Sequence, residues 1–150
     1  MNDEDHLKNQ IRELLLSQRL GVLSTHYKGH PYSSLVAFSS SENLSELYFA
    51  TPGSTRKYRN LSQDNRVSML IDNRSNEISD FHNAIAVTVL GTARKIEGSE
   101  KKQVAGIYLI KHPYLQDFVN SASCVLVMIQ VNRYILVRRF QLVYELHVRK

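Results

Sequence analysis

Residues 50–61 read A-T-P-G-S-T-R-K-Y-R-N-L, and this stretch decides the fold that the sequence predicts. It follows an apolar run, Leu47 to Phe49, that is typical of a β-strand. Pro52 and Gly53 end the strand, and Ser54 is a good N-cap for a helix. The stretch therefore predicts a strand, a tight turn and a short helix.

The predicted helix, residues 55–63, begins with positive charge. Arg56 and Lys57 lie in its first turn, and Arg59 follows closely. The helix macrodipole favours acidic side chains at this end and disfavours cations. Cations are well placed there if an anion lies between them and the free backbone N–H groups. The alternative is a solvated basic helix without a ligand, and spacing alone does not separate the two.

Composition indicates one globular domain, residues 1–150, with 43% hydrophobic and 22% charged residues. The chain is long enough to bury a sizeable core. No apolar run approaches the roughly 18 residues that span a membrane, and the N-terminus does not resemble a signal peptide. We therefore expect a cytoplasmic protein with no membrane partner.

The formal charge of +5 suits nucleic acid, a membrane surface or phosphorylated ligands. The basic residues are spread out, however, and only Arg56 to Arg59 form a dense cluster. There is no basic tail and no helix-turn-helix pattern. We expect a local phosphate site and no specific nucleic-acid partner.

Residues that carry covalent or metal chemistry are sparse. Cys124 is the only cysteine and lies in an apolar run, which indicates a buried, inert thiol rather than a nucleophile. The six histidines show no metal-binding spacing, so we expect surface or loop residues and no metal site. No catalytic acid or base is identifiable from the sequence.

The rest of the chain indicates short antiparallel strands with helices around them. Helices are predicted at 3–18, 55–63 and 99–111, the last capped by Ser99, with a further turn near 115–119. Strands are predicted at 21–25, 31–40, 47–50, 67–71, 84–96, 124–131 and 134–148, with an exposed loop at 72–83. Gly91, inside a strand, marks a bulge or a close backbone approach. The pattern predicts a mainly β (α+β) fold, an antiparallel barrel or sandwich of six or seven strands.

The stretch at 50–61 also resembles the phosphate-binding turn of the pyridoxamine 5'-phosphate oxidase-like FMN-binding split-barrel family. In that family a strand ends in Thr, and a Ser/Thr-Arg-Lys step opens a helix that grips the FMN phosphate. Matching positions are held by Thr51, Thr55, Arg56 and Lys57. The similarity continues through Asn65 to Ser68 and covers roughly residues 11–95. It implies a split β-barrel with peripheral helices.

The same resemblance implies FMN as the cofactor, with its ring lying along the strand that contains residues 32–36. The protein would anchor the phosphate, orient the ring and exclude water. The implied cofactor-binding residues are Ser33, Ser34, Leu35, Val36, Ala50, Thr51, Ser54, Thr55, Arg56 and Lys57.

The chain departs from the true pyridoxamine phosphate oxidases at their substrate apparatus. It has no Trp, and Ala86 stands where those enzymes have Gln. We therefore expect an FMN-dependent oxidoreductase of another small or conjugated substrate. The alternative is a non-catalytic flavin- or haem-binding module, because Lys111-His112-Pro113 resembles a step in the family's haem-handling branch. His112 fits a helix C-cap equally well.

Two runs near the C-terminus, Val125 to Val131 and Tyr134 to Val137, are apolar at successive positions. Such runs indicate burial on both faces of a strand. One face would pack the barrel core and the other a second subunit. We therefore expect a homodimer, and the resemblance likewise implies flavin sites between subunits. The alternative is that the helix at 99–111 covers the second face within one chain.

Overall fold

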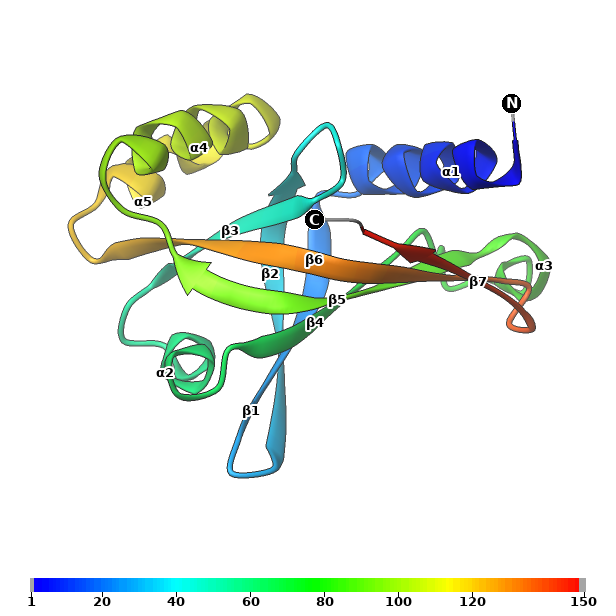
Figure 1. The fold of residues 1–150 in the computed structure, drawn as a ribbon, viewed down its shortest axis with the longest axis horizontal. Coiled ribbons are helices and arrows are strands. Elements are labelled where there is room, and N and C mark those ends of the chain that lie inside the picture. Colours follow the sequence, from blue (N-terminus) through cyan, green and yellow to red (C-terminus); the bar gives the residue numbers. More distant parts are fainter. Residues whose placement is uncertain (1, 149–150) are drawn as a thin grey trace.

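The computed structural model describes residues 2–148, which form an antiparallel barrel surrounded by helices (Figure 1). The strand order is β3-β2-β1-β4-β5-β6-β7, and β3 also pairs with β6. Six strands therefore close the barrel, and β7 extends the sheet beyond it. The strands are β1 (Leu20–Tyr27), β2 (His30–Ser40), β3 (Glu46–Pro52), β4 (Arg66–Asp72), β5 (Ile85–Lys95), β6 (Cys124–Arg138) and β7 (Leu142–His147).

The helices lie outside the barrel wall (Figure 1). They are α1 (Asp3–Ser17), α2 (Arg56–Gln63), α3 (Asp80–Asn83), α4 (Gly98–Lys111) and α5 (Gln116–Asn120), with a 3₁₀ turn at Pro113–Leu115. In α1, Ile11, Leu14 and Leu15 recur on one face and are buried against the barrel core. No helix among residues 2–148 is long and apolar enough to cross a membrane.

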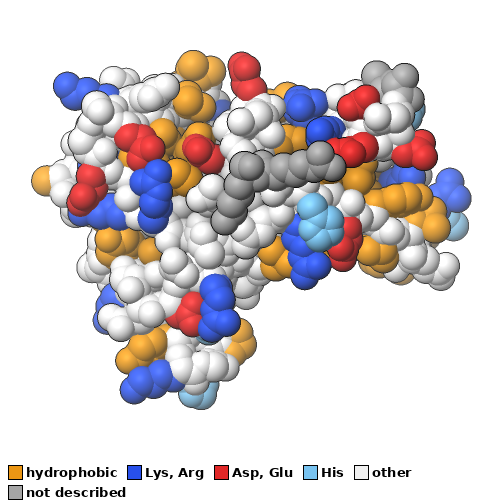
Figure 2. Space-filling view, viewed as in Figure 1, with side chains coloured by type: hydrophobic (Ala, Val, Ile, Leu, Met, Phe, Trp, Pro, Cys, Tyr) orange, Lys and Arg blue, Asp and Glu red, His pale blue; other side chains and the backbone are white. Residues whose placement is uncertain are grey.

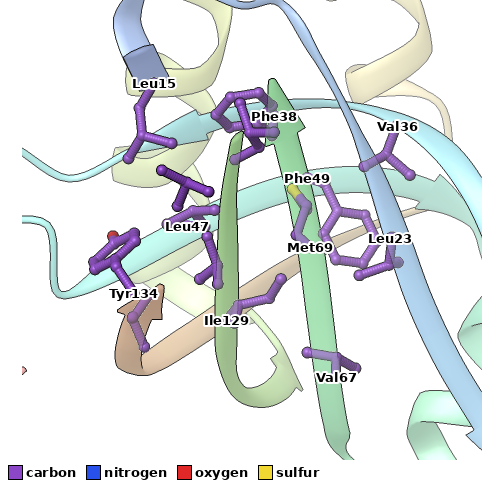
Figure 3. Close-up of a cluster of buried hydrophobic side chains, with 14 of the residues drawn as sticks. Leu15, Leu23, Val36, Phe38, Leu47, Phe49, Val67, Met69, Ile129 and Tyr134 are labelled. Atoms are coloured by element: carbon purple, nitrogen blue, oxygen red, sulfur yellow. The ribbon is translucent and has the colours of Figure 1, made fainter. Parts of the chain in front are cut away.

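The barrel interior is filled by large apolar side chains from several strands. Figure 3 shows this cluster, which includes Leu23, Val36, Phe38, Leu47, Phe49, Val67, Met69, Ile129 and Tyr134. Because alternate residues of each strand point inward, these positions follow the period of two expected for strands with one solvent-facing side. Tyr134 donates its hydroxyl to the carbonyl oxygen of Leu44 at 2.7 Å, so its one polar group is satisfied in the core.

A second apolar cluster covers the outer face of β6. Leu126 and Met128 point away from the barrel core and pack with Val104 and Tyr108 of α4 and Val119 of α5. Residues 125–129 of this run are thus buried on both faces within one chain, whereas Gln130 is exposed. The expectation that a second subunit covers the outer face of this run is wrong. The alternative, that the helix at 99–111 covers it, is confirmed.

The C-terminal strands differ from the prediction. In place of strands at 124–131 and 134–148, β6 is continuous and β7 follows after a turn at 139–141. The β5–β6 register shifts between Leu90, opposite Arg133, and Gly91, opposite Val131. The predicted irregularity at Gly91 is therefore a bulge, and it bends β6 without ending it.

Other predicted boundaries shift by a few residues. The helix after β5 begins at Gly98, so Ser99 lies inside it and Glu97 holds the N-cap position. The loop at 72–83 contains the short helix α3. The β1–β2 hairpin turns at Lys28 and Gly29, whose φ angles of 51° and 78° fit a two-residue type I′ turn.

Candidate functional site

Two threonine hydroxyls build the turn between β3 and α2. Thr51 is buried, and its Oγ1 lies 2.9 Å from Thr55 Oγ1. Thr55 Oγ1 donates to the carbonyl oxygen of Pro52 at 3.0 Å and accepts from the backbone N–H of Tyr58. Thr55 is therefore the N-cap of α2, and the prediction of Ser54 is wrong. The Thr55 N–H closes the turn onto the Pro52 carbonyl, which leaves Ser54 exposed in the loop.

The first turn of α2 carries cations and no acidic residue. Within residues 2–148, neither Arg56 nor Lys57 has an ion pair with a carboxylate. Arg56 instead places its guanidinium 5.3 Å from the centre of the Tyr32 ring. Some arginines elsewhere are paired with a carboxylate, as Arg66 is with Asp64 at 2.7 Å. The positive charge at the start of α2 thus remains available to an anion.

The barrel opens between β2 and β3. Their pairing ends at Phe38, opposite Phe49, whereas β2 stays paired with β1 as far as His30. Beyond Phe49, β3 continues alongside β6. The edge of β2 at residues 33–36 therefore has no strand partner on the side of β3. The two predicted segments, 33–36 and 50–57, flank this opening.

The four β2 residues offer different surfaces to the opening. Val36 is buried in the barrel core, so it presents only backbone groups. Leu35 is 65% exposed and Ser33 is also exposed. The hydroxyl oxygen of Ser34 is buried and has no hydrogen-bond partner in the described part of the chain. An unsatisfied buried hydroxyl beside an open strand edge is the kind of group that a ligand satisfies.

Residues 7–131 match the family model of pyridoxamine 5'-phosphate oxidase. The chain belongs to this family. The match includes α2, the opening between β2 and β3 and most of β6. No curated protein matches the sequence.

Solved structures of similar fold extend this comparison. General Stress Protein 26 from Bacillus anthracis has a TM-score of 0.74 at 21% identity, covering 95% of this chain and 99% of that one. A heme binding protein from Mycobacterium smegmatis has a TM-score of 0.79 at 20% identity, and the match covers 91% of this chain and 55% of that one. A FAD-binding protein from Mesorhizobium loti has a TM-score of 0.70 at 18% identity, and the match covers 86% of this chain and 90% of that one. At such identities the likeness shows the fold alone.

In this member of the pyridoxamine 5'-phosphate oxidase family, Tyr108 of α4 bridges the point where β2 and β3 part. Its hydroxyl donates to the carbonyl oxygen of Ala37 at 3.0 Å and accepts from the backbone N–H of Ala50. Ala37 and Ala50 would form the next pair after Phe38 and Phe49. The phenol thus takes the place of a ladder hydrogen bond, and its burial raises the pKa of Tyr108 to about 12.

Replacing Tyr108 by Phe is expected to destabilise the protein by about 1–3 kcal/mol, because two partly buried backbone groups lose their partner. The amide of Ala50 should also exchange with solvent deuterium faster than in the wild type. Chemical denaturation and hydrogen-exchange mass spectrometry measure the two effects. An Ala50 amide with unchanged protection would contradict the bridging role.

At the end of α4, His112 is buried and Lys111 is half-buried. His112 places Nε2 2.7 Å from the carbonyl oxygen of Phe38, so this nitrogen carries the proton. Burial lowers the pKa of His112. Its C-cap position just outside the helix is confirmed, but His112 is buried and does not lie on the surface. Lys111 donates from Nζ to the carbonyl oxygen of Leu15 at 2.8 Å, and burial lowers the pKa of Lys111 to about 8.

Lys111 predicts a pH dependence of stability. Its folded-state pKa of about 8 lies below the ordinary value of 10.5, so the unfolded chain binds more protons between these values. The contribution of Lys111 to stability should therefore rise as pH increases from 8 to 10.5. Urea unfolding at pH 7 and at pH 9.5 should show this rise in the wild type and a smaller rise in Lys111→Met. Identical pH profiles would contradict the prediction.

The sequence predicts a helix at 99–111, which contains Tyr108, but no local pattern indicates the hydrogen bonds of its hydroxyl. Cys124 is buried, and burial raises the pKa of its thiol, as expected for an inert cysteine. Among the described residues, no group of three His, Cys, Asp or Glu side chains could hold a metal ion.

Proposed function

We propose that the chain is an FMN-binding flavoprotein that anchors the phosphate of the cofactor at the start of α2. The observation that carries this proposal is the pair Arg56 and Lys57, which lies at a helix N-terminus without an acidic partner among residues 2–148. Backbone N–H groups and two cations together form a strong phosphate site. The hydroxyls of Thr51 and Thr55 lie beside it.

Other features of the opening fit a flavin. The edge of β2 at residues 33–36 offers backbone donors and acceptors for the ring, and Ser34 has a buried hydroxyl without a partner. Leu35 supplies exposed apolar surface. Polar groups along one edge and apolar surface against one face are what an isoalloxazine ring requires.

When bound, the flavin would supply hydride or electron transfer, and we propose that the protein is an oxidoreductase of a small or conjugated substrate. The residues of the chain would bind, orient and shield the cofactor. Ala86 pairs with Val137 on β6 and has no side-chain donor. Together with the absence of Trp, this argues against pyridoxamine phosphate as the substrate.

We also propose a homodimer, now supported by a different surface from the run at 125–131. Phe81 and Phe140 are 63% and 65% exposed, and their ring centres lie 5.6 Å apart. With Leu70 and Val137 they line a cavity of about 370 Å³. Exposed apolar surface of this kind marks association sites. Sedimentation at micromolar concentration should give a dimer, and Phe140→Asp should give a monomer.

The function is tested by titrating the apo protein with FMN and with riboflavin, which has the same ring and no phosphate. FMN is expected to bind about 100-fold more tightly, because charged hydrogen bonds contribute about 1.5–3 kcal/mol each. Equal affinities, or a protein that binds neither flavin, would overturn the proposal. A Soret band in the purified protein would favour the haem alternative, although Nε2 of His112 is already bonded to Phe38.

A further inference from the structure

A second cavity lies between the β1–β2 hairpin and α2. The hairpin protrudes below the barrel, and α2 lies beside it (Figure 1). The cavity has a volume of about 640 Å³, within the range typical of small-molecule sites. Its lining residues are Tyr27, His30, Pro31, Tyr32, Gly53, Arg56, Tyr58, Arg59, Asn60, Ser62 and Gln63. Of the residues predicted to bind FMN, only Arg56 is among them.

The strand register explains why the hairpin end is uncovered. Thr25 is paired with Tyr32 and Tyr27 with His30, so the four side chains share one face of the hairpin. Helix α2 covers that face at Thr25, where Asn60 donates from Nδ2 to Thr25 Oγ1 at 3.1 Å. The hairpin continues past this contact. Tyr27 and Tyr32 remain 41% and 37% exposed as an aromatic platform beside the helix.

The cavity is cationic. Its lining contains Arg56 and Arg59 and no acidic residue. These arginines are three residues apart on α2 and therefore face the same side of the helix. Neither forms an ion pair with a carboxylate within the residues that the structure describes. In Figure 2 the protruding lower part of the molecule displays hydrophobic side chains next to Lys and Arg side chains.

The geometry points to a binding site for a planar aromatic anion, next to the proposed flavin site and sharing Arg56 with it. Tyrosine rings stack on flat aromatic molecules, and guanidinium groups bind a carboxylate or phosphate through paired N–H donors. The guanidinium of Arg56 lies 5.3 Å from the centre of the Tyr32 ring, so a cation and an aromatic ring are already close together here. Asn60 and Gln63 add amide groups that suit polar atoms on a ring.

The site should require both a flat ring and a negative charge in its ligand. Matched probes test each requirement in the absence of FMN. Calorimetry would compare naphthoate with naphthamide, which lacks the charge, and with decahydronaphthoate, which lacks the flat ring. Naphthoate is expected to bind about 10-fold more tightly than either. Naphthyl phosphate in the same assay shows whether a phosphate is preferred to a carboxylate.

Variants assign the site to α2. Arg59→Gln is expected to weaken naphthoate binding about 10-fold or more, and Arg59→Lys by less, because lysine keeps the charge and loses the paired donors. Arg19→Gln, at an exposed arginine outside this cavity, should have no effect. FMN affinity should be unchanged in Arg59→Gln, and circular dichroism checks that each variant is folded.

Several results would overturn this inference. Equal binding of naphthoate and its saturated analogue would show that no aromatic platform operates. Equal losses of naphthoate affinity in Arg59→Gln and Arg19→Gln would show that the protein's general positive charge accounts for the effect. A loss of FMN affinity in Arg59→Gln as large as the loss for naphthoate would make the cavity part of the flavin site. Absence of naphthoate binding at millimolar concentration would also overturn the inference of an aromatic-anion site.

Discussion

Arg56→Ala and Lys57→Ala are each expected to weaken FMN binding by about 10- to 100-fold, corresponding to about 1.5–3 kcal/mol. Each variant removes a cation from the start of α2, where no acidic side chain lies in the first turn. Each apo variant is titrated with FMN, and the quenching of flavin fluorescence on binding gives its dissociation constant. Riboflavin affinity should be little changed, because that ligand has no phosphate.

The control must remove a positive charge of the same kind from elsewhere. Arg94→Ala should have little effect on FMN, but Arg94 forms a paired contact with Glu100 at 2.9 and 3.1 Å, so its loss also frees a carboxylate. Arg19→Ala is the cleaner control, because Arg19 is exposed and has no acidic partner among residues 2–148. Equal losses for Arg19, Arg56 and Lys57 would mean that only general charge attracts FMN.

Gly91→Ala is expected to destabilise the fold by about 3–5 kcal/mol, at the upper end of single substitutions. A Cβ at this position would lie 2.2 Å from the carbonyl oxygen of Gln130, and backbone cannot yield as a flexible side chain does. Because the bulge holds the β5–β6 register, relief of the clash requires movement of paired strands. Equilibrium unfolding in urea measures the loss.

Gly106→Ala is the matched control for Gly91→Ala. Gly106 lies within α4, and a Cβ there meets nothing within 4 Å. Alanine favours a helix interior over glycine by about 1 kcal/mol, so this variant should be slightly more stable than the wild type. The two substitutions are chemically identical and should have opposite signs. Destabilisation of similar size at both sites would contradict the argument from Gln130.

The sequence predicts most of the fold because its local signals agree with the tertiary structure. Lys28-Gly29 favours the tight hairpin that the structure contains, and Gly91 marks the bulge. The step from Pro52 to Arg56 predicts the end of one strand and the start of a helix, with an error of one residue at the cap. These features depend on neighbours in the chain, which a sequence displays directly.

The remaining features depend on contacts between distant segments. An apolar run indicates that Leu126 and Met128 are buried, but it does not identify α4 and α5 as the covering. The β6–β7 turn passes through Arg139 and Phe140, both with positive φ and neither a residue that signals this conformation. The bond from Tyr108 to Ala37 joins a helix to a strand far away in the sequence, so no local pattern predicts it.

The position of β6 has a consequence for how the protein is made. One edge of β6 pairs with β5, and the other pairs with β3 and then with β7. During synthesis β3 is therefore paired only with β2, through three residue pairs, until β6 has left the ribosome. Long-range pairing of this kind folds slowly and leaves strand edges exposed. A nascent chain that stops before Cys124 should therefore be a chaperone substrate and prone to aggregate.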